Sequence, residues 1–311
     1  MKQITILSGK GGVGKSSIAA SLAIMLSKNH KIVCADCDVD ASNLALVFGL
    51  REKDFEQWKK ISTTNEKAYL NEKKCNGCKK CVDSCYFNAI SWNKEKNHPV
   101  FDSFSCEGCG VCPMVCPENA ISLIEVKNAK IGYGKTSYGF KVVSGQLEMG
   151  ESGSGKVVAE VKKLAKEQAE TAELMIVDSA AGIGCPVIAS VNGSDFVVAV
   201  TEPTPSGLAD LKRALEITAH FKIKSGIIIN KFDLNLEFTK KIESFASENG
   251  LEIIAKIPYD KSFVDALVNL TPVIVYNHKL EILFIKITEK IKNNLKTNNK
   301  EMFKKVIRIN K

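Results

Sequence analysis

Short apolar runs alternate with longer amphipathic stretches over most of this chain of 311 residues. We predict β-strands at the apolar runs, which lie at residues 2–7, 31–35, 174–177, 196–200 and 226–229. Apolar positions recur every three or four residues in the longer stretches, which predicts helices at residues 16–28, 157–170 and 206–220. Strands that alternate with helices are typical of an α/β fold with a mostly parallel sheet.

Residues 63–126 interrupt this pattern. They contain eight cysteines at short spacing, and they repeat internally, because Cys75–Ile90 and Cys106–Ile121 both end in Asn-Ala-Ile. We therefore predict a small α+β module inserted into the α/β domain. The expected division is a discontinuous α/β domain of residues 1–62 and 127–285, an insert of residues 63–126, and a basic helix or tail of residues 286–311.

Charge and hydropathy exclude some classes of protein. The net charge is +8, but residues 286–311 contribute +7 of it, with nine basic and two acidic side chains. The rest of the chain is nearly neutral, so we expect no specific nucleic-acid binding. No apolar run approaches the roughly 20 residues that span a bilayer, and no signal peptide precedes the first strand. We expect a cytoplasmic protein, in which eleven cysteines indicate metal ligation rather than disulfides.

A glycine-rich motif follows the first predicted strand and opens a helix. It has the form G-x-x-x-x-G-K-S and consists of Gly9, Lys10, Gly11, Gly12, Val13, Gly14, Lys15 and Ser16, followed by Ser17. Its glycines let backbone N–H groups surround phosphate oxygens, and the helix N-terminus adds partial positive charge. We expect Lys15 to bind the β- and γ-phosphates and Ser16 Oγ to bind Mg²⁺, with Ser17 completing the nucleotide-binding set.

The motif has an additional lysine, Lys10, in the run Lys10-Gly11-Gly12-Val13-Gly14-Lys15-Ser16. With this lysine it resembles the deviant phosphate loop of the MinD/ParA/Mrp superfamily. These proteins are SIMIBI-type P-loop NTPases and include the nitrogenase iron protein. The resemblance covers nearly the whole chain outside the insert. It implies an ATP-dependent homodimer in which Lys10 reaches the partner's nucleotide; the alternative is that Lys10 is a solvated loop residue. It also implies that Asp38 orients the attacking water or the magnesium shell. The segment Asp36-Cys37-Asp38 at the end of the second predicted strand resembles the family's switch I region, and the alternative for Asp36 is a helix-capping or turn residue.

The same resemblance assigns later segments. Asp178 follows the hydrophobic residues Ile176 and Val177 and would hold Mg²⁺ through a water molecule. The Gly182 amide would contact the γ-phosphate. Asn230-Lys231-Phe232-Asp233 has the N-K-x-D form of a guanine-recognition motif, but in the resembling family an Asn here contacts adenine, with Pro258 in the second base-binding loop. We favour Mg-ATP as the ligand and keep GTP as the alternative.

The insert contains two cysteine runs with the spacing of bacterial ferredoxins, which predicts two [4Fe–4S] clusters. In this pattern the fourth cysteine of each run binds the other cluster. Cluster one would therefore be held by Cys75, Cys78, Cys81 and Cys116, and cluster two by Cys106, Cys109, Cys112 and Cys85. The alternative is a pair of four-cysteine zinc sites. Tyr86 replaces the usual proline after the fourth cysteine of the first run, which removes no ligand.

Three other features attract attention. Cys34 and Cys37 form C-x-x-C, but on a strand they point to opposite faces, so we interpret them as structural. Cys185 follows the segment that resembles switch II, and either a cluster-related role or a buried small residue fits it. Met302, Phe303, Val306 and Ile307 could form a short membrane-binding helix, although a solvated tail is favoured.

Taken together, these motifs predict an ATPase whose dimer switching drives electron transfer through two [4Fe–4S] clusters toward a redox partner, a metalloenzyme or its maturation. One alternative is an iron–sulfur cluster carrier or assembly factor of Mrp type. The other is a redox-sensing positioning or regulatory ATPase. All eight ligands of a full ferredoxin module favour electron transfer, because permanent ligation suits a resident group better than a cargo.

Overall fold

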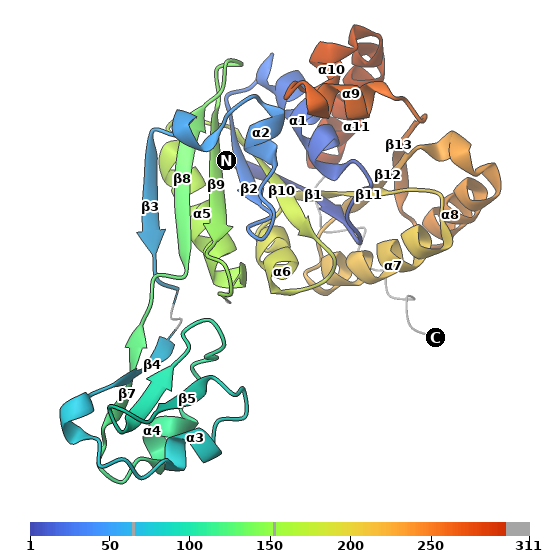
Figure 1. The fold of residues 1–311 in the computed structure, drawn as a ribbon. Helices are drawn as coiled ribbons and strands as arrows, with labels where there is room; N and C mark the ends of the chain where they lie inside the picture. The colour runs from blue at the N-terminus through green and yellow to red at the C-terminus, as the bar shows by residue number, and fades with distance from the viewer. Residues whose placement is uncertain (64–65, 152–153, 297–311) are drawn as a thin grey trace. The chain divides into compact units, whose positions relative to one another are not determined.

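The structure is a computed structural model that describes residues 1–63, 66–151 and 154–296 (Figure 1). It divides into two compact units. The first contains Met1–Lys59, Ile131–Gln146 and the chain from Ser154 on; the second contains Lys60–Lys130 and Leu147–Gly153. The second unit therefore includes the expected insert of residues 63–126 and adds a separate short segment from beyond it.

A nine-stranded sheet forms the centre of the first unit, with the strand order β13-β12-β11-β1-β10-β2-β9-β8-β3. The strands are β1 (Lys2–Ser8), β2 (Ile32–Cys37), β3 (Gln57–Ile61), β8 (Ala129–Lys135), β9 (Lys141–Leu147), β10 (Leu174–Ala181), β11 (Phe196–Thr201), β12 (Ser225–Asn230) and β13 (Glu252–Ile257). Each pair from β13 to β9 runs parallel. The predicted α/β fold with a large, mostly parallel sheet is confirmed.

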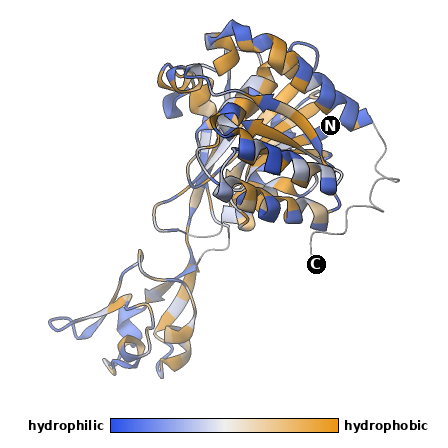
Figure 2. Cartoon of the chain, turned by 90° about the vertical axis from the view of Figure 1, so that its right-hand side faces the viewer, coloured by the Kyte–Doolittle hydropathy of each residue, from blue (hydrophilic) through white to orange (hydrophobic). Residues whose placement is uncertain are grey.

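Helices cover both faces of this sheet. Alternate residues of β1 show why: Ile4 and Ile6 pack in the core beneath one helical layer, and Leu7 packs beneath the other. Figure 2 shows the strands coloured mainly as hydrophobic, with hydrophilic residues on the outer helices. The first layer contains α1 (Lys15–Ser27), α2 (Leu44–Val47), α9 (Ser262–Val268), α10 (Val273–Tyr276) and α11 (Glu281–Lys296). The second contains α5 (Ser154–Gln168), α6 (Cys185–Val191), α7 (Pro205–His220) and α8 (Leu236–Glu248).

The last helix crosses the expected boundary at residue 286. Helix α11 places Phe284, Ile287 and Ile291 in the main core, with no exposed surface on these side chains. Residues 286–296 therefore belong to the α/β unit instead of the tail, because their apolar positions recur at helical spacing against the sheet. The helix considered for residues 302–307 lies outside the described residues. Short 3₁₀ turns occur at η1 (Glu52–Asp54), η3 (Phe232–Leu234) and η4 (His278–Leu280).

The second unit is built from two similar halves. Two antiparallel strand pairs, β4 (Glu66–Leu70) with β7 (Ile121–Glu125) and β5 (Ile90–Asn93) with β6 (His98–Phe101), accompany η2 (Glu72–Lys74), α3 (Lys80–Asp83) and α4 (Val111–Val115). The sequence repeat is also a repeat of backbone conformation. Three pairs of equivalent residues have positive φ: Gly77 and Gly108, Lys79 and Gly110, and Asn88 and Asn119.

Candidate functional site

The glycine-rich loop lies between β1 and α1, at the carboxyl edge of the parallel strands. Gly12 and Gly14 have φ values of +79° and +89°, which favour glycine. A Cβ on Gly14 would lie only 2.6 Å from Asn230 Nδ2, so this position has no room for a side chain. The predicted strand, loop and helix are all present, and Ser16 and Ser17 lie in the first turn of α1.

Lys15 and Asp178 form a buried ion pair beside this loop. Lys15 Nζ lies 2.5 Å from Asp178 Oδ1, and the two side chains are 7% and 1% exposed. The other carboxylate oxygen, Asp178 Oδ2, is buried and has no hydrogen-bond partner among the described residues. Such an oxygen fits an acceptor for a magnesium-bound water, because buried polar atoms are normally paired.

Asp36 organises the loop that carries Asp38. Its Oδ2 accepts hydrogen bonds from Ser42 Oγ at 2.7 Å and from the Leu44 amide at 2.9 Å. Burial and the neighbouring Asp178 raise the pKa of Asp36 to about 7. Half-buried Asp38 also has a raised pKa, caused by burial and opposed by Lys15. The Asp38 amide also donates to Asp36 Oδ1 at 3.3 Å, so Asp36 makes a turn contact, which was the alternative that the sequence offered for it.

The predicted trans lysine is held within its own protomer. Lys10 Nζ lies 2.6 Å from Glu202 Oε1 and 3.2 Å from Ser206 Oγ. Lys231 Nζ lies 3.1 Å from Glu202 Oε2 and donates to the Gly12 carbonyl at 3.3 Å. Burial alone would raise the pKa of Glu202, but hydrogen bonds from the two lysines lower it below its ordinary value. Glu202 was not predicted, since no local motif marks a carboxylate that acts on a loop 190 residues away.

The two expected base-binding loops lie next to each other. Asn230 is buried, and its Nδ2 donates to the Val13 carbonyl of the phosphate loop at 2.8 Å. Asp233 Oδ1 accepts a hydrogen bond from the Tyr259 amide at 2.6 Å, which joins this loop to the one that contains Pro258. Asn230 and Pro258 are therefore brought to one side of the glycine-rich loop.

The segment that resembles switch II begins inside β10, which continues to Ala181. The Gly182 amide donates to the Ser8 carbonyl at 3.0 Å, and its φ is +99°. Cys185 begins α6 directly afterwards and is exposed, so its interpretation as a buried small residue was wrong. The far end of α6 is held by buried Lys162 on α5, whose Nζ donates to the carbonyls of Ala189, Ser190 and Asn192 at 2.9, 3.1 and 2.6 Å. Burial lowers the pKa of Lys162 to about 8.

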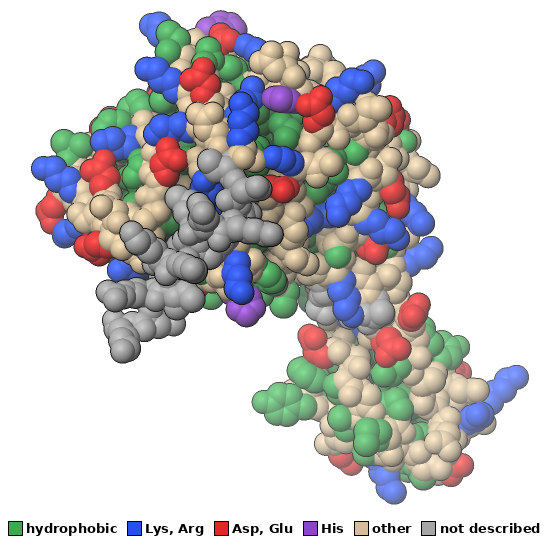
Figure 3. All heavy atoms as spheres, turned by 180° about the vertical axis from the view of Figure 1, so that it is seen from behind, with side chains coloured by type: hydrophobic (Ala, Val, Ile, Leu, Met, Phe, Trp, Pro, Cys, Tyr) green, Lys and Arg blue, Asp and Glu red, His purple; other side chains and the backbone are tan. Residues whose placement is uncertain are grey.

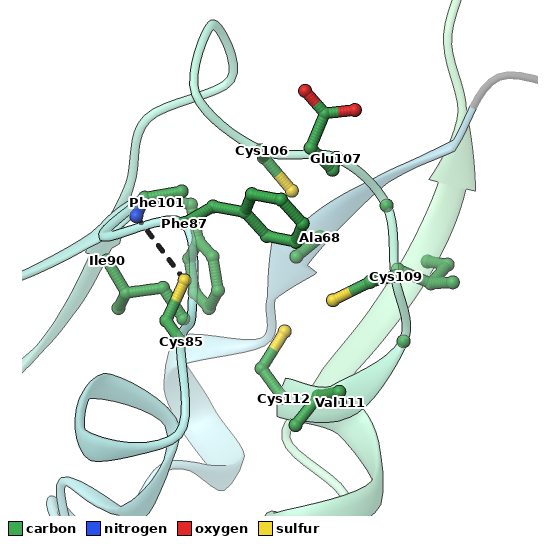
Figure 4. A pocket seen from close by; sticks show the side chains of 14 residues that line it. Ala68, Cys85, Phe87, Ile90, Phe101, Cys106, Glu107, Cys109, Val111 and Cys112 are labelled. Carbon is green, nitrogen blue, oxygen red and sulfur yellow. Dashed lines mark hydrogen bonds between the residues drawn. The ribbon is translucent and has the colours of Figure 1, made fainter.

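Two pockets in the second unit are lined by cysteines. One is lined by Cys85, Cys106, Cys109 and Cys112, and Figure 4 shows their sulfurs around a common space beside Phe87. The other is lined by Cys75, Cys78, Cys81 and Cys116. The hollows measure about 350 and 310 Å³, including space open to solvent. Each pocket combines three cysteines of one run with the fourth cysteine of the other run.

The fourth cysteine of each run is held in the same way. Cys85 Sγ accepts a hydrogen bond from the Ala89 amide, and Cys116 Sγ accepts one from the Ala120 amide, both at 3.3 Å. Hydrogen bonds to sulfur stabilise a thiolate and tune the potential of an iron–sulfur centre, so the donor set fits such a group. In the described part of the chain, no three His, Cys, Asp or Glu side chains are placed to hold one metal ion.

The C-x-x-C of β2 is separate from these pockets. Cys34 belongs to the core on one face of the sheet. On the other face, Lys162 and Ser190 are near Cys37. Burial raises the pKa of Cys37 to about 12 and that of Cys34 well above its ordinary value. No helix of the described residues is long and apolar enough to cross a membrane.

Comparison with known proteins places this site in a family. Residues 4–273 match the CobQ/CobB/MinD/ParA nucleotide-binding domain. The chain is 41% identical over 234 residues to the uncharacterized protein MJ0578 of Methanocaldococcus jannaschii, covering 75% of this chain and 79% of that protein. It is 38% identical to a cytosolic Fe-S cluster assembly factor Nubp2 homolog of Anopheles gambiae, but over only 69 residues, which are 21% of this chain and 27% of that protein.

Solved structures share the fold. The septum site-determining protein MinD of Pyrococcus horikoshii, complexed with Mg-ADP, superposes with a TM-score of 0.56 at 18% identity, covering 93% of this chain and 95% of that one. The MinD cell division protein of Aquifex aeolicus gives a TM-score of 0.56 at 19% identity over 94% and 98% of the two chains.

Proposed function

The chain belongs to the CobQ/CobB/MinD/ParA nucleotide-binding family of P-loop ATPases, and from this premise we propose that it couples ATP-driven dimer switching to electron transfer through two [4Fe–4S] clusters. The observation that carries the proposal is the composition of the two thiolate pockets, each with three cysteines of one run and the fourth of the other. This crossed arrangement is the one that two-cluster bacterial ferredoxins use.

The nucleotide site would work through a few side chains. Lys15 would neutralise the β- and γ-phosphates, which requires it to exchange Asp178 for the nucleotide. Asp178, freed from the lysine, would accept from a water of Mg²⁺, and Ser16 Oγ would bind the ion directly. Asp38 would orient the water that attacks the γ-phosphate, held in place by the loop that Asp36 organises.

The dimer supplies the coupling. Lys10 would leave Glu202 and reach the nucleotide of a second copy, so that ATP favours the dimer over the monomer. The clusters would supply one-electron storage when bound. Nucleotide can change their behaviour only as far as it prefers one state of the protein, so a measurable coupling free energy is expected.

The test is an anaerobic redox titration followed by electron paramagnetic resonance. We expect about eight iron atoms per chain and two [4Fe–4S]¹⁺ signals on reduction. We expect MgATP to shift at least one midpoint potential by ~60 mV, which corresponds to about 1.4 kcal/mol for one electron, and Lys10→Ala to abolish the shift. Zinc in place of iron would refute the cluster assignment. Midpoint potentials that are the same with and without MgATP would refute the proposal that nucleotide controls electron transfer through the cluster potential.

A second candidate is an iron–sulfur carrier, favoured by the similarity to the Nubp2 homolog. A carrier releases its cargo, whereas a redox protein retains its clusters. Incubation of the loaded chain with an apo-ferredoxin and a chelator separates the two: ATP-dependent transfer of clusters supports the carrier, and retention of all eight irons supports electron transfer.

A further inference from the structure

The two halves of the second unit are alike in backbone but opposite in charge. Residues 71–96, around the first cysteine run, contain six lysines and three acidic residues, a net charge of +3. Residues 97–126, around the second run, contain four acidic residues and no lysine or arginine, a net charge of −4. Because both halves form the same turns, the fold does not require this difference.

One backbone position makes the contrast clear. Lys79 has φ +61° at the N-terminus of α3, and its equivalent Gly110 has φ +79° at the N-terminus of α4. Glycine adopts this left-handed conformation without steric cost, whereas lysine does not. The chain therefore keeps a lysine where glycine would suffice. Its Nζ lies 5.1 Å from the ring centroid of Trp92, and both residues line the pocket of Cys75, Cys78, Cys81 and Cys116, which we call the first pocket.

Three other lysines are close in sequence to the cysteines of the same pocket. Lys73 and Lys74 immediately precede Cys75, Lys80 follows Lys79, and all four side chains are exposed. Figure 3 shows lysine side chains on more than one side of this unit, with acidic side chains also exposed. We call these four residues the lysine face. Cys78 is also exposed, so a molecule seated on the lysine face would lie beside a ligand sulfur.

The second pocket, formed by Cys85, Cys106, Cys109 and Cys112, has an acidic residue beside it. Exposed Glu107 follows Cys106, where Asn76 follows Cys75 in the first run. Lys67 is close to this pocket, since its Nζ donates to the Cys106 carbonyl at 2.8 Å. However, Lys67 is buried and lies 3.5 Å from Glu151, so it presents no charge to a surface.

We propose that the lysine face, Lys73, Lys74, Lys79 and Lys80, is the docking site for an acidic electron-carrier protein, which exchanges electrons through the first pocket. The inference rests on the proposed function, because it requires a cluster in that pocket. One electron passes from the carrier's reduced iron–sulfur or flavin centre to the oxidised cluster; the carrier is oxidised, the cluster is reduced, and no bond or proton changes place. Opposite charges steer such partners together and fix the side on which they meet.

Affinity for a small acidic two-cluster ferredoxin, measured by surface plasmon resonance on the full-length loaded chain, tests the proposal. The docking variant is Lys73→Gln, Lys74→Gln, Lys79→Gln and Lys80→Gln. The matched control changes four exposed lysines of the first unit, Lys163, Lys166, Lys240 and Lys286, to glutamine, for the same change in net charge. At low salt we expect the docking variant to bind at least ~10-fold more weakly and the control to change less than ~2-fold. At ~0.5 M salt the difference should vanish.

Equal losses in both variants would overturn the proposal, since they would report net charge alone. Binding of anionic lipid vesicles or duplex DNA through the same lysines, with no binding of ferredoxin, would overturn it as well. Iron content and paramagnetic signals of every variant separate the two levels of inference. Intact clusters with unchanged affinity refute the docking site alone, whereas a protein that cannot hold clusters refutes the proposed function.

Discussion

The restraint on Lys10 leads to a quantitative prediction. In the structure, Glu202 binds the lysine that would have to reach a second copy, so the carboxylate would compete with formation of the proposed dimer. Glu202→Gln keeps the size of the side chain and removes its charge. We expect the substitution to free Lys10 and to strengthen the ATP-bound dimer.

The magnitude follows from exposure and geometry. The Lys10–Glu202 pair is short, 2.6 Å, but its side chains are 29% and 17% exposed, so solvent screens it. Partly exposed pairs contribute about 1 kcal/mol. Two protomers release their lysines on dimerisation, so the gain is about 2 kcal/mol, or ~30-fold in the dissociation constant of the dimer.

Sedimentation equilibrium with a slowly hydrolysed ATP analogue measures this constant directly. Because Glu202 also binds Lys231, Lys231→Met is the control for effects that act through that residue. A double-mutant cycle with Lys10→Ala isolates the coupling, and the gain should disappear when Lys10 is absent. A Glu202→Gln dimer that is no tighter than the wild type, or a gain that persists without Lys10, would refute the reasoning.

Three further predictions concern buried groups and cysteines. Lys162→Met removes three hydrogen bonds from the carbonyls at the end of α6, of which the Ser190 carbonyl keeps its bond from Gln3 Nε2, so we expect a loss of about 2 kcal/mol in the free energy of unfolding, measured in urea; unchanged stability would contradict the capping role. The pKa of Asp36 is raised to about 7, so the folded state takes up a proton first as pH falls from 8 to 5. As pH falls through that window, the free energy of unfolding of the wild type should therefore rise relative to that of Asp36→Asn by up to about 1.4 kcal/mol per pH unit. Free energies of unfolding from urea titrations that change in parallel with pH in the two proteins would contradict this. Cys85→Ser should reduce iron from about eight to about four atoms per chain, whereas Cys37→Ser should retain all of it; equal iron in both would contradict the assignment.

The nucleotide site illustrates what local sequence can predict. The strand, loop and helix from Lys2 to Ser27 follow from a motif and its periodicity, and family membership confirms that interpretation. Glu202 and the capping role of Lys162 were missed, because each acts through contacts with residues distant in sequence. Neither the periodicity of a helix nor a short motif records such pairings.

The end of the α/β unit was misplaced for a different reason. The composition changes near residue 286, because lysines there dominate the net charge of the segment. Ile287 and Ile291 nevertheless continue the apolar stripe of α11 into the core. Periodicity was the better guide than charge at this point. The cysteine runs remain a prediction about iron, and the pockets show that the fold brings the same sets of four thiols together.

The place of the second unit in the chain has a consequence for folding. Strand β3 ends at Ile61 and its neighbour β8 begins at Ala129, so most of the second unit is a loop between two paired strands at the edge of the sheet. Closing a flexible loop of this length costs about 3–4 kcal/mol of chain entropy. β3 is mostly exposed and gains little burial to offset that cost. Ordering of the loop would therefore decide whether β3 stays on the sheet, so protection of its amides from hydrogen exchange would report how completely the loop is ordered.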